Sequence, residues 1–414
     1  MNPLPRAAWI PRSRTTRAKL ALLSLMGLVL VLAAYLRFTV IDDSLVMSPY
    51  QADAAEYYNY AYNLRHHGVY SGADAELNHG TLIPGADAIR PPAYPLFLTP
   101  FAAGPHDRIG IRHIAYAQAC AGVLTVLLVF WILDQLGRPR LAVAAATLTA
   151  ISPQLVNACA YMVGETLFAL LTVLTIYLLC MGFRKASWSL LCLLLAGLVG
   201  GLATMVRPAL QYLILCLPIP LLAARPRRRS LNGAAMIILG ALLVWGPWIG
   251  RNYVDFGASG EGAQLHDALY QGGKPLQLWS WDEDQGTHDI FIYPTLLSPY
   301  NNHRFLFLTT HAFMRGLQWP LLVLALLGCI YVFLPSAGGR FEEPALLPLR
   351  MMSMLFLYEN CLLALGPPFM RYSIPLLPVV FIMGLIYLQI VYAYAVDLRQ
   401  RSRVRWKQRT GRSP

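Results

Sequence analysis

The sequence predicts an all-α integral membrane protein of about ten transmembrane helices, with interfacial helices in a large first outer loop. Two observations carry this prediction. Of the 414 residues, 57% are hydrophobic and only 13% are charged, whereas about a quarter of the residues of a soluble protein are charged. The apolar residues also fall into runs of about 20, the length that crosses a bilayer as a helix.

The apolar runs define the predicted spans and the domain. The first run follows a basic tail and exceeds the apolar length of a secretory signal, so we expect it to remain as the first helix. The chain then forms one domain over 19–396, between basic cytoplasmic tails at 1–18 and 397–414. The ten spans lie near residues 19–41, 111–136, 140–160, 164–183, 188–206, 208–224, 231–249, 311–334, 347–366 and 373–396.

Lysine and arginine are distributed unevenly over the loops between these spans. With the N-terminus inside, the inner loops and tails hold 22 of the 33 basic residues but only four of the 21 acidic ones. The positive-inside rule therefore predicts an inner (cytoplasmic) membrane protein with both termini cytoplasmic. Topology accounts for the net charge of +12, and we expect no nucleic-acid binding.

Two long polar loops, 42–110 and 251–310, then lie outside, and all nine histidines are on that side. Binding and catalytic residues concentrate in such loops, so we expect the active site on the outer face.

Metal and cofactor motifs are missing from the sequence. The first loop contains His66, His67 and His79, but no HxxxH or HExxH spacing. All seven cysteines fall inside apolar stretches, where neither a disulfide framework nor a CxxC metal site is expected. We therefore expect no metal site and no required cofactor; a divalent cation is compatible with the outer loops but is not indicated.

The first outer loop opens with a segment that has helical spacing. Asp53, Glu56, Tyr57 and Tyr60 would share one face of a helix over 51–64. A carboxylate beside aromatic rings near a membrane surface suits a general base next to a sugar-binding wall. The alternative is an interfacial helix whose acidic first turn only favours the helix dipole.

Arg90 precedes two prolines, in the segment Arg90-Pro-Pro-Ala-Tyr-Pro-Leu-Phe-Leu. The prolines stiffen the chain before an interfacial or re-entrant helix and hold Arg90 at the level of the headgroups. A planar guanidinium suits bidentate contact with a phosphate. The alternative is snorkelling of Arg90 to lipid headgroups.

Further charges mark the outer ends of the predicted spans. Glu165 opens the fourth span, where it is either functional or an acid that stabilises a helix N-terminus. Arg207, Arg251 and Arg371 lie at outer ends, against the positive-inside bias. An anionic ligand explains such cations, and together with Arg90 they predict a phosphate-bearing lipid.

Six segments in this order resemble the GT-C superfamily, in particular the dolichyl-phosphate-mannose protein mannosyltransferases and the lipid A aminoarabinose transferases. The resemblance extends over roughly 20–395. It rests on the acidic-aromatic segment after the first span, the Arg-Pro-Pro-Ala-Tyr-Pro stretch, Ser152-Pro153 with Gly164-Glu165-Thr166, the Gly197 to Arg207-Pro208 segment, Pro247-Trp248 with Arg251-Asn252-Tyr253, and Arg371-Tyr372-Ser-Ile-Pro375.

The resemblance implies transfer of a sugar from a polyprenyl-phosphate carrier to an acceptor on the outer face. It makes Asp53 the first-loop catalytic acid, Arg90 the residue that contacts the carrier phosphate, and Glu165 a second acid. Relatives carry adjacent acids where this chain has Asp-Ala-Ala-Glu, so the part of Glu56 stays open. Relatives often add helices or an outer domain after this point, so the acceptor is not implied.

The sequence therefore predicts a polyprenyl-phosphate-dependent glycosyltransferase, with a lipid, glycan or protein as acceptor and no required cofactor. We expect an Asp general base with inversion, a phosphate clamp that adds Arg207, Arg251, Arg371 and Tyr372 to Arg90, and a substrate lining of Tyr57, Tyr60 and His79. The alternatives are a flippase or transporter of a lipid-linked saccharide, or a non-catalytic protein of cell-envelope assembly. Polar residues at one face, without an internal repeat, count against a transporter.

The topology is directly testable. A cysteine introduced at Arg228, in a background without the native cysteines, should react with an impermeant thiol reagent only after the membrane is opened, because basic loops stay inside. A cysteine within 42–110 should react in intact cells. Labelling at Arg228 from outside contradicts the orientation.

Overall fold

The computed structural model is helical throughout its described part. It describes residues 16–43, 53–74, 83–105, 108–183, 189–207, 217–222, 227–257, 319–339, 341, 343–365 and 374–410. Every regular element in these stretches is a helix and none is a β-strand, so the predicted all-α class is confirmed.

Five described helices are long and apolar enough to cross a membrane. A sixth span results if α5 (Pro139–Ile151) and the helical segment Pro153–Ala160, which bend by 56° at the break between them, are counted together. The five long helices are α1 (Thr16–Asp43), α4 (Arg108–Gln135), α7 (Glu165–Phe183), α11 (Arg227–Asn252) and α18 (Leu377–Thr410).

The other predicted spans correspond to shorter helices or lie mostly outside the described residues. α8 (Leu190–Val206), α15 (Trp319–Tyr331) and α16 (Glu343–Leu365) are apolar, but their apolar stretches are shorter than 18 residues. Of the predicted span 208–224, the structure describes 217–222, with the short α10 (Ile219–Leu222). The described residues thus support five or six spans of the ten predicted.

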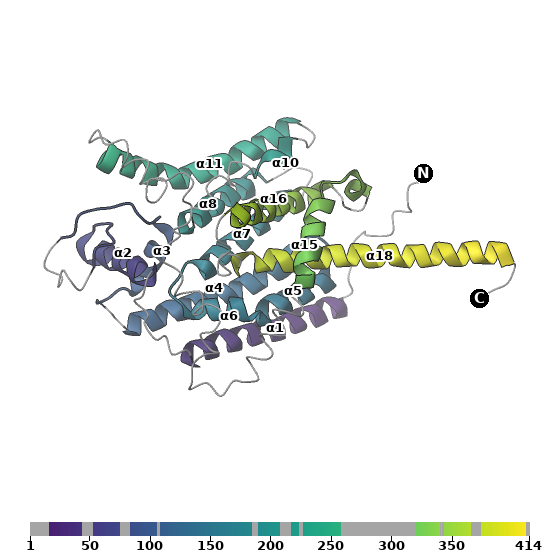
Figure 1. The fold of residues 1–414 in the computed structure, drawn as a ribbon, viewed down its shortest axis with the longest axis horizontal. Helices are drawn as coiled ribbons and strands as arrows, with labels where there is room; N and C mark the ends of the chain where they lie inside the picture. Colours follow the sequence, from purple (N-terminus) through teal and green to yellow (C-terminus); the bar gives the residue numbers. More distant parts are fainter. Residues whose placement is uncertain are drawn as a thin grey trace.

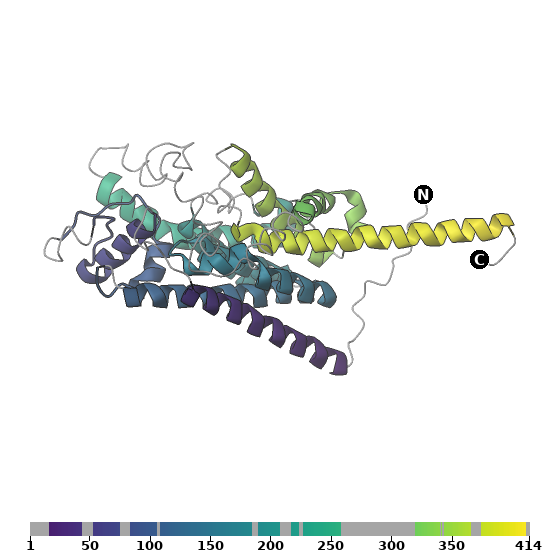
Figure 2. The same ribbon diagram turned by 60° about the horizontal axis from the view of Figure 1, so that its bottom comes forward.

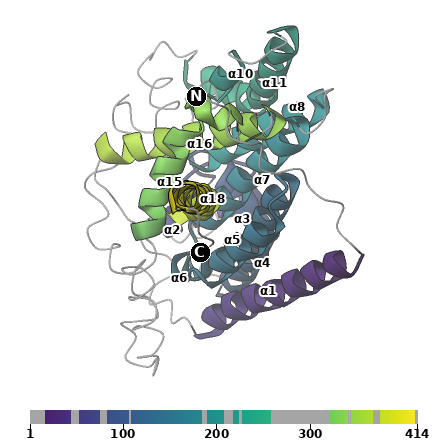
Figure 3. The ribbon, with the colours of Figure 1, turned by 90° about the vertical axis from the view of Figure 1, so that its right-hand side faces the viewer.

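The long helices lie side by side, and the described parts of the segment between α1 and α4 pack at one end of them. α2 (Asp53–His67) and α3 (Ala93–Leu98) lie together at that end (Figures 1 and 2). α1 begins and α18 ends toward the opposite end, where α18 extends beyond the other helices. Viewed along the bundle, α1 lies at the periphery (Figure 3), and its exposed Leu23, Leu28 and Val31 form an apolar surface suited to lipid.

The largest buried cluster joins α1, α4, α5 and α7 to α15, α16 and α18. α4 packs against α1, α5 and α7, and α7 in turn packs against α8. A second cluster holds α8 and α11 against α7 and α16. The bundle therefore forms a continuous support beneath α2 and α3.

α8 and α11 approach so closely that their backbones touch at glycines. A Cβ on Gly197 would lie 2.1 Å from the Ile237 carbonyl oxygen, and one on Gly240 would lie 2.3 Å from that of Leu194. Small residues permit this approach between membrane helices. It fixes α11, whose last turn carries Arg251, relative to the rest of the bundle.

A buried arginine links α1 to the broken end of α5. Ser152 and Pro153 interrupt the helix, so the last carbonyls of α5 lack partners within it. The Arg37 guanidinium, 1% exposed, donates to the carbonyl oxygens of Ala150 (3.0 Å) and Thr149 (3.1 Å). A cation there also complements the dipole at the C-terminus of α5.

The close contact of α8 and α11 can be tested by substitution of its glycines. Gly240→Ala should destabilise the protein by about 1–3 kcal/mol, because a Cβ forces the two backbones apart. Gly250→Ala on the same helix is the control, since nothing lies within 4 Å of its Cβ position. Thermal unfolding midpoints of both variants in detergent micelles test this. Equal midpoints would mean that the glycine contact is not tight.

Candidate functional site

α2 carries the two first-loop acids on its first turn, as the residue spacing predicts. Asp53 and Glu56 lie at its N-terminal end, and Arg65, His66 and His67 lie in its last turn. Both sets complement the helix dipole. The helix ends at Gly68, whose φ of +66° is a backbone conformation that glycine adopts without strain. The two acids therefore lie at the N-terminal end of α2, where the helix dipole favours negative charge.

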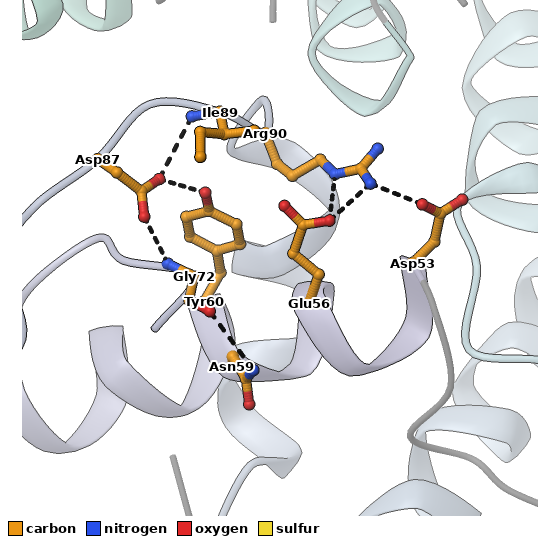
Figure 4. Close-up of polar contacts among 8 residues, drawn as sticks. All are labelled: Asp53, Glu56, Asn59, Tyr60, Gly72, Asp87, Ile89 and Arg90. Atoms are coloured by element: carbon orange, nitrogen blue, oxygen red, sulfur yellow. Dashed lines mark hydrogen bonds and ion pairs between the residues drawn. The ribbon is translucent and has the colours of Figure 1, made fainter. Parts of the chain in front are cut away.

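Arg90 bridges both acids (Figure 4). Its Nη2 atom lies 2.6 Å from Asp53 Oδ1 and 2.6 Å from Glu56 Oε2, and its Nε atom donates to the same Glu56 oxygen at 2.8 Å. The guanidinium also lies over the Tyr57 ring, 5.4 Å from its centroid. The three charged side chains are 19–28% exposed. The predicted base and the predicted phosphate ligand are thus direct partners.

This arrangement keeps Arg90 charged. Burial by itself would lower the pKa of the guanidinium, but Tyr57, Asp53 and Glu56 outweigh burial and raise that pKa above its ordinary value. Nε and Nη2 are occupied by the carboxylates, whereas Nη1 makes no hydrogen bond within the described part of the chain. The site thus holds a permanent cation with one donor group available.

Tyr94 separates this cluster from Glu165. The Tyr57 and Tyr94 rings meet edge to face, with centroids 5.0 Å apart. The Tyr94 hydroxyl donates to Gln118 Oε1 (2.8 Å), and the Gln118 amide donates to the carbonyl oxygens of Cys159 and Tyr161. Tyr94 is therefore fixed between α2 and α4, beside the segment that precedes α7.

Glu165 is the first residue of α7 and is buried in the helix bundle. It is 7% exposed and lines a cavity of about 10 Å³ together with Arg37, Thr125 and Thr149. That volume accommodates about one water molecule. The structure thus places Glu165 with Arg37, and not in the carboxylate pair that Arg90 holds.

Of the other predicted phosphate ligands, the structure describes Arg207 and Arg251. Arg207 follows α8, with its guanidinium 5.8 Å from the centroid of the Phe168 ring. Arg251 forms an ion pair with Asp255 at 2.8 Å and donates to the Asp87 carbonyl oxygen, also at 2.8 Å. Arg371, Tyr372 and His79 lie outside the described residues.

Tyr60, a predicted substrate-lining residue, is fully buried, and its hydroxyl donates to Asp87. The ring of Tyr57, the other predicted tyrosine, lies against the Arg90 guanidinium. This ring is the aromatic surface that the charged cluster offers to a ligand.

Sequence reasoning missed Asp87, Tyr70 and Arg37. Asp87 and Tyr70 stand in loop sequence without a helical period, so no local pattern marks them. Arg37 did carry a signal, because a charge inside an apolar span is a candidate for a structural or functional role.

Comparison with known proteins gives the family likeness of this fold and site. The family model described as dolichyl-phosphate-mannose-protein mannosyltransferase matches residues 90–249, less than half of the chain, beginning at Arg90. No curated protein sequence matches the chain.

Among solved structures, the chain is similar to the oligosaccharyltransferase AglB of Archaeoglobus fulgidus. The complex with an inhibitory peptide and a dolichol-phosphate has a TM-score of 0.57 and 14% identity, over 97% of this chain and 53% of that one. The apo form of the Archaeoglobus fulgidus oligosaccharyltransferase has a TM-score of 0.56 and 14% identity, over 94% and 53%. This chain thus spans about half the length of those enzymes.

Both comparison proteins are members of the GT-C superfamily, so the predicted resemblance to that superfamily is confirmed. At 14% identity, the structural likeness establishes the fold only. The chain is accordingly a membrane protein with a GT-C-like helical fold.

Proposed function

We propose that this protein transfers a sugar from a polyprenyl-phosphate donor to an acceptor on the extracytoplasmic face of the inner membrane. The observation that carries the proposal is Arg90, one guanidinium that binds the Asp53 and Glu56 carboxylates and keeps Nη1 available. The family likeness supports a lipid-linked donor, and a dolichol-phosphate is bound in one AglB structure.

The reaction requires opposite charges within one site. The bond between the anomeric carbon and the carrier phosphate oxygen breaks, while a bond to the acceptor oxygen forms. The leaving phosphate carries the developing negative charge, which a nearby guanidinium stabilises. The acceptor proton passes to a carboxylate, for which we assign Asp53. A single displacement of this kind inverts the anomeric configuration.

Arg90 and Asp53 are coupled in this mechanism. A carboxylate paired with a guanidinium accepts a proton less readily than a released one. When a donor phosphate binds the Arg90 guanidinium, the ion pair between Arg90 and Asp53 weakens, and Asp53 becomes a better base. Glu56, which contacts two nitrogens of Arg90, keeps the guanidinium oriented during this exchange.

The mechanism requires no metal, because Arg90 supplies the positive charge beside the phosphate. Activity should therefore persist after treatment with a chelator. The predicted roles of Glu165 as a second acid and of Arg207, Arg371 and Tyr372 as phosphate ligands remain parts of the proposal.

The full topology also belongs to the proposal. It comprises ten spans, both termini in the cytoplasm and α2 on the outer side. The location of α2 and α3 at the end of the bundle opposite the start of α1 supports placing α2 on the face opposite the N-terminus. The gathering of titratable side chains at α2 counts against the flippase alternative, because transporters bind substrates near the bilayer midplane.

Arg90→Ala should weaken binding of a polyprenyl phosphate. Loss of a hydrogen bond to a charged group costs about 1.5–3 kcal/mol, or roughly 10- to 150-fold in Kd. Arg90→Lys should restore part of the affinity because it keeps the charge. Arg112→Ala is the control, since Arg112, near the start of α4, is another arginine that contacts a tyrosine, Tyr116. Wild-type affinity of Arg90→Ala would indicate that Arg90 contacts lipid headgroups and not the carrier phosphate.

Asp53→Asn should give a folded protein that binds donor but transfers sugar about 10²- to 10⁴-fold more slowly, because asparagine accepts no proton at neutral pH. Glu56→Gln should reduce transfer less. Release of the carrier from a panel of polyprenyl-phosphate sugars measures both. Turnover by Asp53→Asn within a few-fold of wild type excludes Asp53 as the base, and equal losses leave the base unassigned between the two acids.

A further inference from the structure

Asp87, three residues before Arg90, is the centre of a hydrogen-bonded loop. Its carboxylate accepts hydrogen bonds from the Tyr60 hydroxyl, from the Gly72 amide at 2.7 Å and from the Ile89 amide at 3.3 Å (Figure 4). These donors come from α2, from the segment after α2 and from the segment that carries Arg90. One carboxylate thus ties three parts of the first outer loop together.

Tyr70 fixes the backbone of Arg90 itself. Its hydroxyl donates to the Arg90 carbonyl oxygen at 2.9 Å. Its ring stacks on Tyr60, with centroids 4.5 Å apart, and meets the Trp248 ring edge on at 5.1 Å. Tyr70 therefore connects Arg90 to the buried side of α2 and to α11.

Arg251 joins this loop to the helix bundle. Its Nη1 atom donates to the Asp87 carbonyl oxygen at 2.8 Å, and its Nε atom pairs with Asp255 at 2.8 Å. Its guanidinium also lies near the rings of Tyr70 (5.8 Å) and Trp248 (5.3 Å). α11, which carries Arg251 and Trp248, is held against α8 by the close glycine contacts.

These contacts form a continuous path from α11 to Arg90. We infer that Asp87 and Arg251 are positioning residues, which set the place of the Arg90 guanidinium for a carrier phosphate without contacting that phosphate. The inference rests on the proposed function. It gives Arg251 a different role from the direct phosphate ligand that the sequence predicts, because the loop backbone and Asp255 occupy its guanidinium.

The inference has two measurable consequences. In wild-type protein the Ile89 amide is bonded to Asp87, so it should exchange slowly with deuterium. Without Arg251 the loop loses its tie to α11, and amide exchange across residues 86–91 should rise about tenfold because local opening costs less free energy. The affinity for the phosphate should fall about tenfold as well, since displacement of a binding group by about 1 Å is costly.

The experiment uses the full-length protein in lipid nanodiscs, with undecaprenyl phosphate as the probe. Deuterium exchange of peptides that cover 69–73 and 86–91 and the Kd of the probe are measured for Arg251→Ala, Arg251→Lys and Asp87→Asn. Lysine should recover part of both losses, because it retains the charge and a donor. The double variant Asp87→Asn with Arg251→Ala should lose no more affinity than the worse single variant, since both act through one path.

Arg65→Ala is the matched control. Arg65 also donates to loop carbonyls, those of Thr99 and Pro100, but away from Arg90. It should change neither the exchange of 86–91 nor the Kd. Thermal midpoints of all variants identify any that have simply unfolded, and Tyr70→Phe, which deletes the single hydrogen bond to the Arg90 carbonyl, gives a milder second test.

Three outcomes overturn the inference. Unchanged exchange of 86–91 in Arg251→Ala shows that the path does not hold the loop. Raised exchange with unchanged Kd, where Arg90→Ala does lose affinity, shows that the path does not position Arg90. Additive affinity losses for Asp87→Asn and Arg251→Ala show that Arg251 contacts the phosphate itself. If instead Arg90→Ala binds the probe normally while exchange of 86–91 rises in Arg251→Ala, the proposed function fails. The contacts from α11 would then still hold the loop.

Discussion

The first outer loop depends on one guanidinium between two carboxylates. Asp53 and Glu56 lie one turn apart on the same face of α2, where like charges repel. Arg90 compensates both, and it comes from a point more than 30 residues further along the chain. The attraction among these three charges draws the start of α2 and the Arg90 segment together. It thereby sets where α3 begins and where Tyr57 and Tyr94 face each other.

The charged cluster and the loop that supports it differ in their exposure to solvent. The cluster is partly open to solvent, as a ligand site must be, whereas the Tyr60 and Tyr70 side chains behind it are buried. Burial raises the pKa of both phenols, and the Asp87 hydrogen bond raises that of Tyr60 further. Both tyrosines therefore stay protonated at neutral pH and keep donating their hydrogen bonds to the loop.

Local patterns predicted the parts of this site that are local. Helical spacing placed Asp53 and Glu56 on one face of α2, and the proline pair after Arg90 marked a stiff entry to α3. The sequence could not show that Arg90 binds those acids, because the contact joins distant segments. The family resemblance names Glu165 as a second acid beside Asp53, and the structure places Glu165 at the start of α7, where it lines a cavity with Arg37. Five or six of the ten predicted spans correspond to described helices of membrane-crossing length.

The Arg37 contact separates two events in the making of this protein. The guanidinium belongs to α1, but its acceptors on α5 lie 112 and 113 positions later in the chain. At about 5–20 residues per second, translation needs roughly 6–23 s to supply them. During that interval the charge sits near the end of α1, close enough to the membrane surface to reach water or headgroups. Arrival of α5 then draws the guanidinium into the bundle, so the pairing of these two helices follows the insertion of the first one.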